Sequence, residues 1–284
     1  MSFWRTFSFV AAVFTVVLAA LWTISWAETR TVPARSGGPP ASAADAFVGE
    51  ELTYNLGFWF FSGVAVGKIS LEKQGDIYVA TLKAHTTGIA AWLRHREDTY
   101  IARFERAPGS DRFRTLSFEE DVTIGSKHRR TVTLIDYERG VMRWRKWKNG
   151  RLRKSGEFII PPGAFYDDPI TAFYNLRRGV YGPIEGGREY LIKTLPSEEG
   201  EDVDIYLRIA TEDEFRSRSG GEKAAARYLA DVKIPGKLFD SKSGKMEILF
   251  DASLIPVWAV AKDIIFFGDV WGELVESSRT AGID

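Results

Sequence analysis

Apolar and polar residues alternate along most of the chain after residue 47, and this two-residue period is typical of half-buried β-strands. Glycine-containing turns such as Gly75-Asp76 and Lys148-Asn149-Gly150 separate the alternating segments. Ser62-Gly63 is predicted to be the first of these turns. The pattern predicts strands at residues 51–61, 64–73, 77–86, 99–104, 112–120, 129–137, 141–147, 152–160, 189–195, 204–211, 226–233, 245–251, 257–264 and 266–276. Their short connections predict antiparallel pairing.

One segment, residues 168–178, has a helical pattern instead. Asp168 suits the N-cap, Pro169 suits the first helical position and Gly179 suits the residue after the helix. An apolar face at three- and four-residue spacing is formed by Ile170, Phe173, Tyr174 and Leu176. A single apolar helix among strands must bury this face. We therefore expect a mainly β (α+β) fold, in which a curved antiparallel sheet or half-barrel wraps around one short helix.

The N-terminus has the pattern of a secretory signal. Arg5 is the only charged residue before Glu28, and an apolar run at residues 7–26 ends near the small residues Ser25 and Ala27. This pattern predicts a signal peptide at residues 1–27 and a periplasmic protein. An uncleaved anchor in the inner membrane is the alternative, because the run approaches the length of a spanning helix.

Composition suggests one domain after this signal. Residues 28–46 are rich in Pro, Gly, Ser and Ala, which predicts a flexible linker. We expect a single β-rich domain at residues 47–276 and a C-terminal tail at residues 277–284. The chain has no cysteine, so its fold cannot rest on disulfides. Its 38 basic and 38 acidic residues give no net charge to attract nucleic acid.

Catalytic and metal-binding patterns are weak in this sequence. His85, His95 and His128 lack the spacing of metal ligands, and we expect no metal, no cofactor and no catalytic residue. Glu119 and Glu120 are adjacent on a predicted strand, so they point to opposite faces and cannot both line one cleft.

A second carboxylate pair precedes the predicted helix. Asp168 of this pair already has a capping role, which leaves Asp167 as the remaining candidate. We therefore expect a protein that is not an enzyme.

Aromatic residues are more numerous than a thin sheet needs. Some should fill the core and others should line an apolar cavity for a small hydrophobic molecule. The candidate ligand-binding residues are Trp59, Phe61, Ile89, Trp92, Leu93 and Phe173. Residues 88–93 form an apolar segment with no predicted strand partner, and we expect a loop at the rim or lid of the cavity.

A basic strand at residues 143–148 offers a possible interaction surface. Alternation places Arg143, Arg145 and Trp147 on one face. Basic and aromatic side chains together can contact anionic head groups at a membrane or an envelope protein partner. The simpler interpretation is an amphipathic strand with solvated charges.

Several short motifs, in order, resemble a known family. They are Gly49-Glu50-Glu51-Leu52-Thr53-Tyr54, the hairpin segment from Phe61 to Gly67, the Ala-Phe-Tyr-x-Leu-Arg pattern of the helix, and Leu254-Ile255-Pro256-Val257. In this order the chain resembles the exported proteins catalogued as domain of unknown function 3108, over about residues 47–275. The resemblance implies an outline similar to periplasmic lipoprotein carriers, with a curved sheet, an enclosed helix and an apolar cavity. It supplies no catalytic residues.

The sequence thus favours a non-catalytic periplasmic carrier or binding protein for a lipid or other hydrophobic molecule. An envelope assembly or scaffolding factor that binds a protein partner is the alternative. A hydrolase of envelope glycans or lipids is a second alternative.

Overall fold

The computed structural model describes residues 44–93, 95–196, 200, 203–219, 225–235, 241–264 and 268–279. Within them the chain forms strands β1 (Glu50–Phe58), β2 (Phe61–Gln74), β3 (Ile77–Thr86), β4 (Arg96–Arg106), β5 (Phe113–Ile124), β6 (Lys127–Asp136), β7 (Val141–Lys148), β8 (Arg151–Ile159), β9 (Glu189–Lys193), β10 (Asp204–Ile209), β11 (Tyr228–Lys233), β12 (Lys245–Phe250), β13 (Pro256–Ile264) and β14 (Gly268–Arg279). The helices are η1 (Asp45–Phe47), α2 (Gly88–Leu93), α3 (Pro169–Arg177) and α4 (Glu212–Arg218). The predicted signal peptide, residues 1–27, lies outside the described residues.

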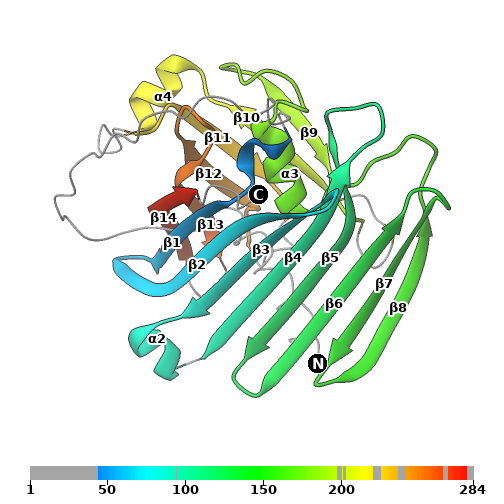
Figure 1. The fold of residues 1–284 in the computed structure, drawn as a ribbon. Helices are drawn as coiled ribbons and strands as arrows, with labels where there is room; N and C mark the ends of the chain where they lie inside the picture. Colours follow the sequence, from blue (N-terminus) through cyan, green and yellow to red (C-terminus); the bar gives the residue numbers. More distant parts are fainter. Residues whose placement is uncertain are drawn as a thin grey trace.

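All of the named strands join one antiparallel sheet (Figure 1). Its order is β8-β7-β6-β5-β4-β3-β2-β1-β14-β13-β12-β11-β10-β9, so the first and last strands of the chain meet in the middle and β8 and β9 form the edges. We refer to β1–β8 as the N-terminal half of the sheet and to β9–β14 as the C-terminal half. The mainly β fold predicted from alternation is confirmed.

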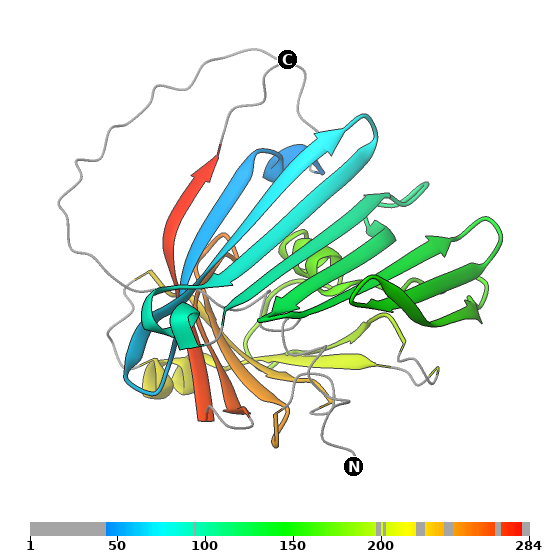
Figure 2. The same ribbon diagram turned by 90° about the horizontal axis from the view of Figure 1, so that it is seen from below.

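The sheet curves around α3. Figure 2 shows this helix lying between the two halves, with the N-terminal half on one side and the C-terminal half on the other. The helix begins as predicted, with Asp168 as N-cap and Pro169 in the first turn. Its central residues, from Ile170 to Leu176, are buried, which satisfies the requirement that an apolar helix cover its face.

The first hairpin turns earlier than the prediction. Phe58 pairs with Phe61, so the turn is at Trp59-Phe60, and Ser62-Gly63 lies inside β2. Trp59 adopts a positive φ of 50°, an uncommon conformation for a large residue. The indole N–H of Trp271 holds it there by donating to the Trp59 carbonyl at 2.9 Å. Because this tertiary contact stabilises the turn at Trp59-Phe60, the chain does not turn at Ser62-Gly63.

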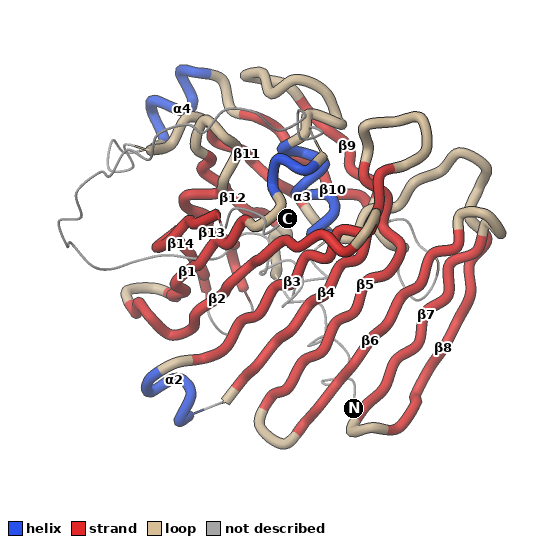
Figure 3. The backbone as a smooth tube through the Cα atoms, in the orientation of Figure 1, coloured by secondary structure: helices blue, strands red, loops and turns tan. Residues whose placement is uncertain are grey.

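Two α-helices were missed by the strand pattern (Figure 3). The segment predicted as an apolar loop forms α2, and α4 follows a capping box in which Thr211 and Glu214 exchange hydrogen bonds. The capping box was readable from the Thr-x-x-Glu spacing. Strand β14 also continues past Glu276, the predicted end of the domain, and pairs with Glu50 of β1 as far as Arg279.

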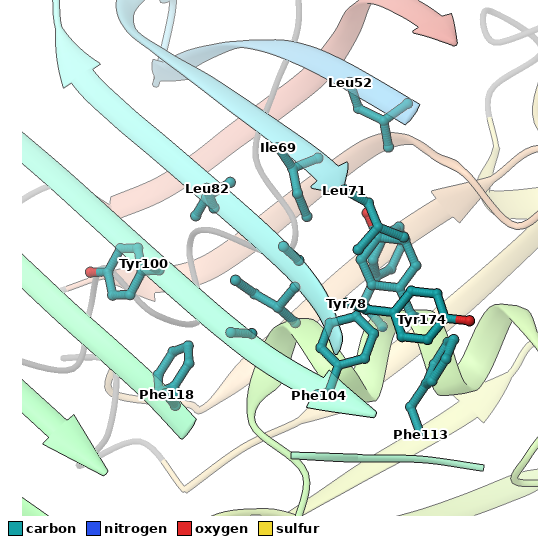
Figure 4. Close-up of a cluster of buried hydrophobic side chains, with 14 of the residues drawn as sticks. Leu52, Ile69, Leu71, Tyr78, Leu82, Tyr100, Phe104, Phe113, Phe118 and Tyr174 are labelled. Atoms are coloured by element: carbon teal, nitrogen blue, oxygen red, sulfur yellow. The ribbon is translucent and has the colours of Figure 1, made fainter. Parts of the chain in front are cut away.

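The tightest packing of α3 is against the N-terminal half. Tyr174 lies in an aromatic cluster with Phe104 and Phe113, shown in Figure 4, where the Phe104 and Phe113 ring centroids are 4.9 Å apart and those of Phe104 and Tyr174 are 5.9 Å apart. Tyr78 stacks on Phe104 at 5.7 Å. Such contacts add to the stabilisation from the buried apolar area, so this half forms a closely packed core.

Candidate functional site

The start of α3 is fastened to β5 by a buried polar network. Asp168 accepts hydrogen bonds from the backbone N–H groups of Ile170 and Thr171 at 2.8 and 3.1 Å. Its other carboxylate oxygen accepts from the Thr171 hydroxyl at 2.5 Å and from the Thr115 hydroxyl at 2.8 Å. Burial raises the pKa of Asp168 to about 6, against the opposing effect of these donors. The N-cap therefore joins the helix to the sheet as well as ending it.

The remainder of α3 is fastened to the same half. The Asn175 side chain donates to the Phe113 carbonyl and accepts from the Phe113 N–H, both at 2.9 Å. Arg177 forms a two-pronged ion pair with Glu50 of β1, with N–O distances of 2.5 and 2.8 Å. The two side chains are 1% and 3% exposed. Because these groups are buried, their partners fix both the position and the rotation of the helix.

The opposite side of α3 faces an apolar cavity of about 60 Å³. Every described residue that lines it is apolar. From the helix and its start come Pro169, Ala172, Phe173 and Leu176, and from β9–β13 and their flanking residues come Ile192, Ile205, Leu207, Val232, Ile234, Met246, Ile248, Phe250 and Pro256. A cavity of this kind offers water no hydrogen-bond partner. Burial of further apolar groups in this cavity would be favourable in free energy.

The predicted ligand-binding residues separate into two groups. Phe173 is buried on α3 and lines the cavity. Trp59, Phe61 and Trp92 are exposed and do not belong to the cavity lining. The predicted contributions of the Ile89 and Leu93 side chains lie outside the part of the chain that the structure describes. The helix residue is thus brought to the cavity, whereas the three aromatic residues gather at the surface.

Most of the cavity lining was not singled out from the sequence. The missed residues are ordinary aliphatic positions such as Ala172, Leu176, Met246 and Ile248. The alternation of β12 and the spacing of the helix face mark them as inward-facing. No signal in the sequence shows that these particular inward faces meet each other loosely.

The paired carboxylates have the opposite-face arrangement predicted for them. Glu119 accepts from the Arg130 guanidinium at 2.6 Å, whereas Glu120 is buried on the other face of β5. Burial raises the pKa of Glu120 to about 7, and Lys146 and Thr131 partly oppose this shift. These two neighbours lie level with Glu120 on β6 and β7.

Asp167, the other carboxylate candidate, is completely buried before α3. It binds the Arg112 guanidinium and accepts from the Tyr181 hydroxyl at 2.5 Å. Burial raises the pKa of Asp167, while Arg112 has the opposite effect. Its contacts tie the segment before α3 to the start of β5.

The histidines lie apart from the cavity. His128 is 2.7 Å from the Asp121 carboxylate and His95 is 3.2 Å from Glu97. Within the described ranges no group of three or more His, Cys, Asp or Glu residues could hold a metal ion. In that same part of the chain, no helix has both the length and the apolar character needed to span a membrane.

The basic strand β7 has the alternation predicted for it. Met142 is buried, whereas Arg143 and Arg145 are exposed. Arg143 pairs with Glu157 of β8 at 2.6 Å, and the Arg130 guanidinium lies 5.7 Å from the Trp147 ring centroid. The three predicted surface residues thus lie on the outer face of β7, away from α3.

Comparison with known proteins agrees with the resemblance found in the sequence. No curated protein matches the chain. Among solved structures, a crystal structure from Brucella abortus titled as a beta-barrel-like protein of domain of unknown function DUF1849 is similar, with a TM-score of 0.49 and 11% identity. The similarity covers 83% of this chain and 99% of that one. Residues 51–270 match the model of a family described as protein of unknown function, DUF3108. The chain therefore belongs to the DUF3108 family.

Proposed function

We propose that the protein is a non-catalytic carrier or binding protein for a lipid or other hydrophobic molecule, exported to the periplasm. The observation that carries the proposal is the wholly apolar cavity between α3 and the C-terminal half of the sheet. Binding sites for small molecules are typically concave and mostly apolar. The signal-like N-terminus agrees with a role outside the cytoplasm.

A ligand larger than a few atoms requires the cavity to widen. Its volume of about 60 Å³ is below the roughly 150 Å³ of an engineered cavity that holds benzene. The polar contacts of Asp168 and Asn175 hold α3 to the N-terminal half. On the cavity side the described contacts of the helix are apolar, apart from the end of the helix, where Arg177 reaches the Ser253 carbonyl at 3.4 Å. Directly before the helix, the Asp167 N–H donates to the Lys193 carbonyl at 3.1 Å, so β9 stays attached to the start of α3. The part of the C-terminal half beyond β9 can move away from α3 while these polar contacts stay in place.

Binding free energy would come from removal of apolar surface from water, at about 25 cal/mol per Å². An acyl chain or a flat polycyclic molecule fits this requirement, because neither needs a buried hydrogen-bond partner. The carboxylates considered for hydrolysis have other surroundings. Asp167 is bound to Arg112 and Tyr181, and Glu120 faces away from Glu119. The proposal accordingly assigns no reaction to the protein.

The test is native mass spectrometry, with lipid extraction, on protein purified under mild conditions from the compartment that receives it. A discrete co-purifying lipid or hydrophobic metabolite is expected for the natural sequence. Ala172→Leu is the matched variant, because the larger side chain fills part of the cavity, and it should lose the bound species while remaining folded. A ligand-free mass for the natural sequence, with one stoichiometric protein attached, would contradict the carrier and favour an assembly factor.

A further inference from the structure

The β1–β2 turn and the neighbouring helix α2 carry a group of exposed aromatic side chains. Trp59, Phe60 and Phe61 of the β1–β2 turn are 61%, 82% and 47% exposed, and Trp92 of α2 is 85% exposed. We call these four residues the aromatic tip. The sequence around them is uncharged, with no Asp, Glu, Lys or Arg between Glu51 and Lys68 or between His85 and Arg94. Grouped exposed apolar side chains mark interaction surfaces.

The turn and the helix are held together by hydrogen bonds. The Thr87 hydroxyl donates to the Gly63 carbonyl at 2.5 Å, and the Thr87 N–H donates to the Val64 carbonyl at 3.0 Å. Thr87 directly precedes α2, so these bonds place the helix beside β2. Figures 1 and 2 both show α2 and the β1–β2 turn at the same end of the sheet. The aromatic tip is therefore one surface.

The backbone groups of Trp59 are satisfied within the protein. The Trp59 carbonyl accepts from the Trp271 indole N–H, and the Trp59 N–H donates to the Asp269 carbonyl at 3.4 Å. Gly268 leaves room for the Trp59 indole, since a Cβ there would lie 2.5 Å from the indole nitrogen. Internal satisfaction of backbone polar groups is the condition for contact with lipid, where each unpaired group costs several kcal/mol.

We propose that the aromatic tip docks on the surface of a phospholipid bilayer. Tryptophan and other aromatic side chains favour the boundary between acyl chains and head groups, because they combine a large apolar area with, in Trp, an N–H donor. A protein partner would instead be expected to use charged and hydrogen-bonding groups at the rim of the contact. The two segments that carry the tip have no charged residue, and the neighbouring charges of Lys262 and Asp269 are already paired with each other at 3.3 Å.

The tip and one end of the candidate cavity lie at the same level of the sheet, with β14 and β13 between β1 and β12. Phe58 contacts the rings of Trp59 and Phe61, with centroid distances of 6.2 and 5.4 Å, and packs against the buried cluster of the C-terminal half. Strand pairing places Phe58 level with Met246, a cavity residue, through Val270 and Ala261. Docking would bring this end of the cavity to the bilayer surface.

The experiment is flotation of the full folded chain with vesicles of phosphatidylcholine, which carries no net charge. We expect the natural sequence to bind and Phe60→Ser combined with Trp92→Ser to reduce the partition coefficient by roughly tenfold or more. Both side chains are exposed, so these changes spare the core. Ile159→Ser is the matched control, because Ile159 is 85% exposed and lies on the edge strand β8. Its substitution should leave binding unchanged.

Any of three results with vesicles would overturn docking by the tip. They are the absence of binding by the natural sequence, equal binding by the tip variant, and binding only to anionic vesicles that disappears in Arg143→Ala combined with Arg145→Ala. A tip-dependent complex with a protein but not with vesicles would also overturn it. The inference is independent of cavity binding, since Ala172→Leu should keep full vesicle binding even where it loses the ligand.

Discussion

The two sides of α3 differ in how they meet the sheet. Toward the N-terminal half the helix presents Tyr174 to an aromatic cluster and forms buried polar contacts through Asp168, Asn175 and Arg177. Toward the C-terminal half it presents Ala172 and Leu176 to an apolar cavity. The N-terminal half therefore fixes the position of α3, whereas the C-terminal half leaves an apolar cavity beside it.

This division separates stability from ligand binding within one sheet. On the N-terminal side, close packing and buried polar partners hold α3 in a single arrangement that cannot adjust to a ligand. A cavity sacrifices dispersion contacts but leaves room for an apolar guest. Substitutions on the two sides should therefore have different consequences.

The largest effect is expected at the ion pair that fixes the end of α3. Arg177→Ala removes the two-pronged partner of the buried Glu50 carboxylate, which keeps only the longer contact with Arg279 at 3.9 Å, and should lower the free energy of unfolding by about 3–5 kcal/mol. Urea unfolding measures this change. Replacing both members with apolar residues, as in Glu50→Leu with Arg177→Met, should recover much of the loss. A loss below about 1 kcal/mol in Arg177→Ala would mean that the helix is seated by other contacts.

A medium effect should distinguish the two halves directly. Ala102→Leu adds a larger side chain to the close-packed face of β4 and should destabilise the protein by about 1–3 kcal/mol. The same change at Ala172 enters the cavity and should be neutral or stabilising by up to about 1 kcal/mol. Thermal unfolding of the two variants gives the comparison. Equal destabilisation would show that the cavity side is packed as tightly as the other.

A pH-dependent effect is expected at Glu120. Since burial raises its folded-state pKa to about 7, above the ordinary value of 4.5, the folded state holds this proton more tightly than the unfolded state. Ionisation therefore opposes folding, and the contribution to stability is present below about pH 4.5 and is lost as the pH rises through about 7.

Glu120→Gln cannot ionise and should gain stability relative to the natural sequence between pH 5 and pH 8, by on the order of 1–3 kcal/mol. Urea unfolding at the two pH values measures the gain. Glu119→Gln, on the opposite face of β5, controls for the loss of a neighbouring charge. A difference that is the same at both pH values would contradict the raised pKa.

The smallest effect is expected on the outer face of β7. Arg143 and Glu157 are both about half exposed, so their ion pair is solvated and screened. Arg143→Ala should change the free energy of unfolding by less than about 0.5 kcal/mol in urea. A loss of stability comparable to that of Arg177→Ala would show that the stability of strands β6–β8 depends on this ion pair.

The sequence predicted the parts of this fold that follow from local patterns. Two-residue alternation located the strands, and Asp168 and Pro169 located the start of α3. The first turn was misplaced because Phe58-Trp59-Phe60-Phe61 has no alternation, and the contact that selects the turn comes from Trp271, far away in the sequence.

The candidate site was harder to predict than the fold. Phe173 was identified because it lies on the only strong helical pattern, whereas Met246 and Ile248 look like any inward-facing strand residues. Whether two inward faces pack or leave a gap depends on long-range curvature of the sheet. The sequence alone does not distinguish an aromatic residue that lines a cavity from one that lies on the surface. The exposure of Trp92 could therefore not be predicted either.

The methionine methyl groups report directly on a ligand between α3 and the C-terminal half. The chain has three methionines, of which Met246 lines the cavity and Met142 is buried in a separate cluster with Ile135 and Ile160. Methyl-labelled methionine gives one NMR signal for each, and dodecanoate serves as a probe whose alkyl chain is apolar. We predict that the Met246 signal shifts and saturates during titration while the Met142 signal stays in place. An unchanged Met246 signal, or equal shifts of both signals, would contradict a ligand site between α3 and the C-terminal half.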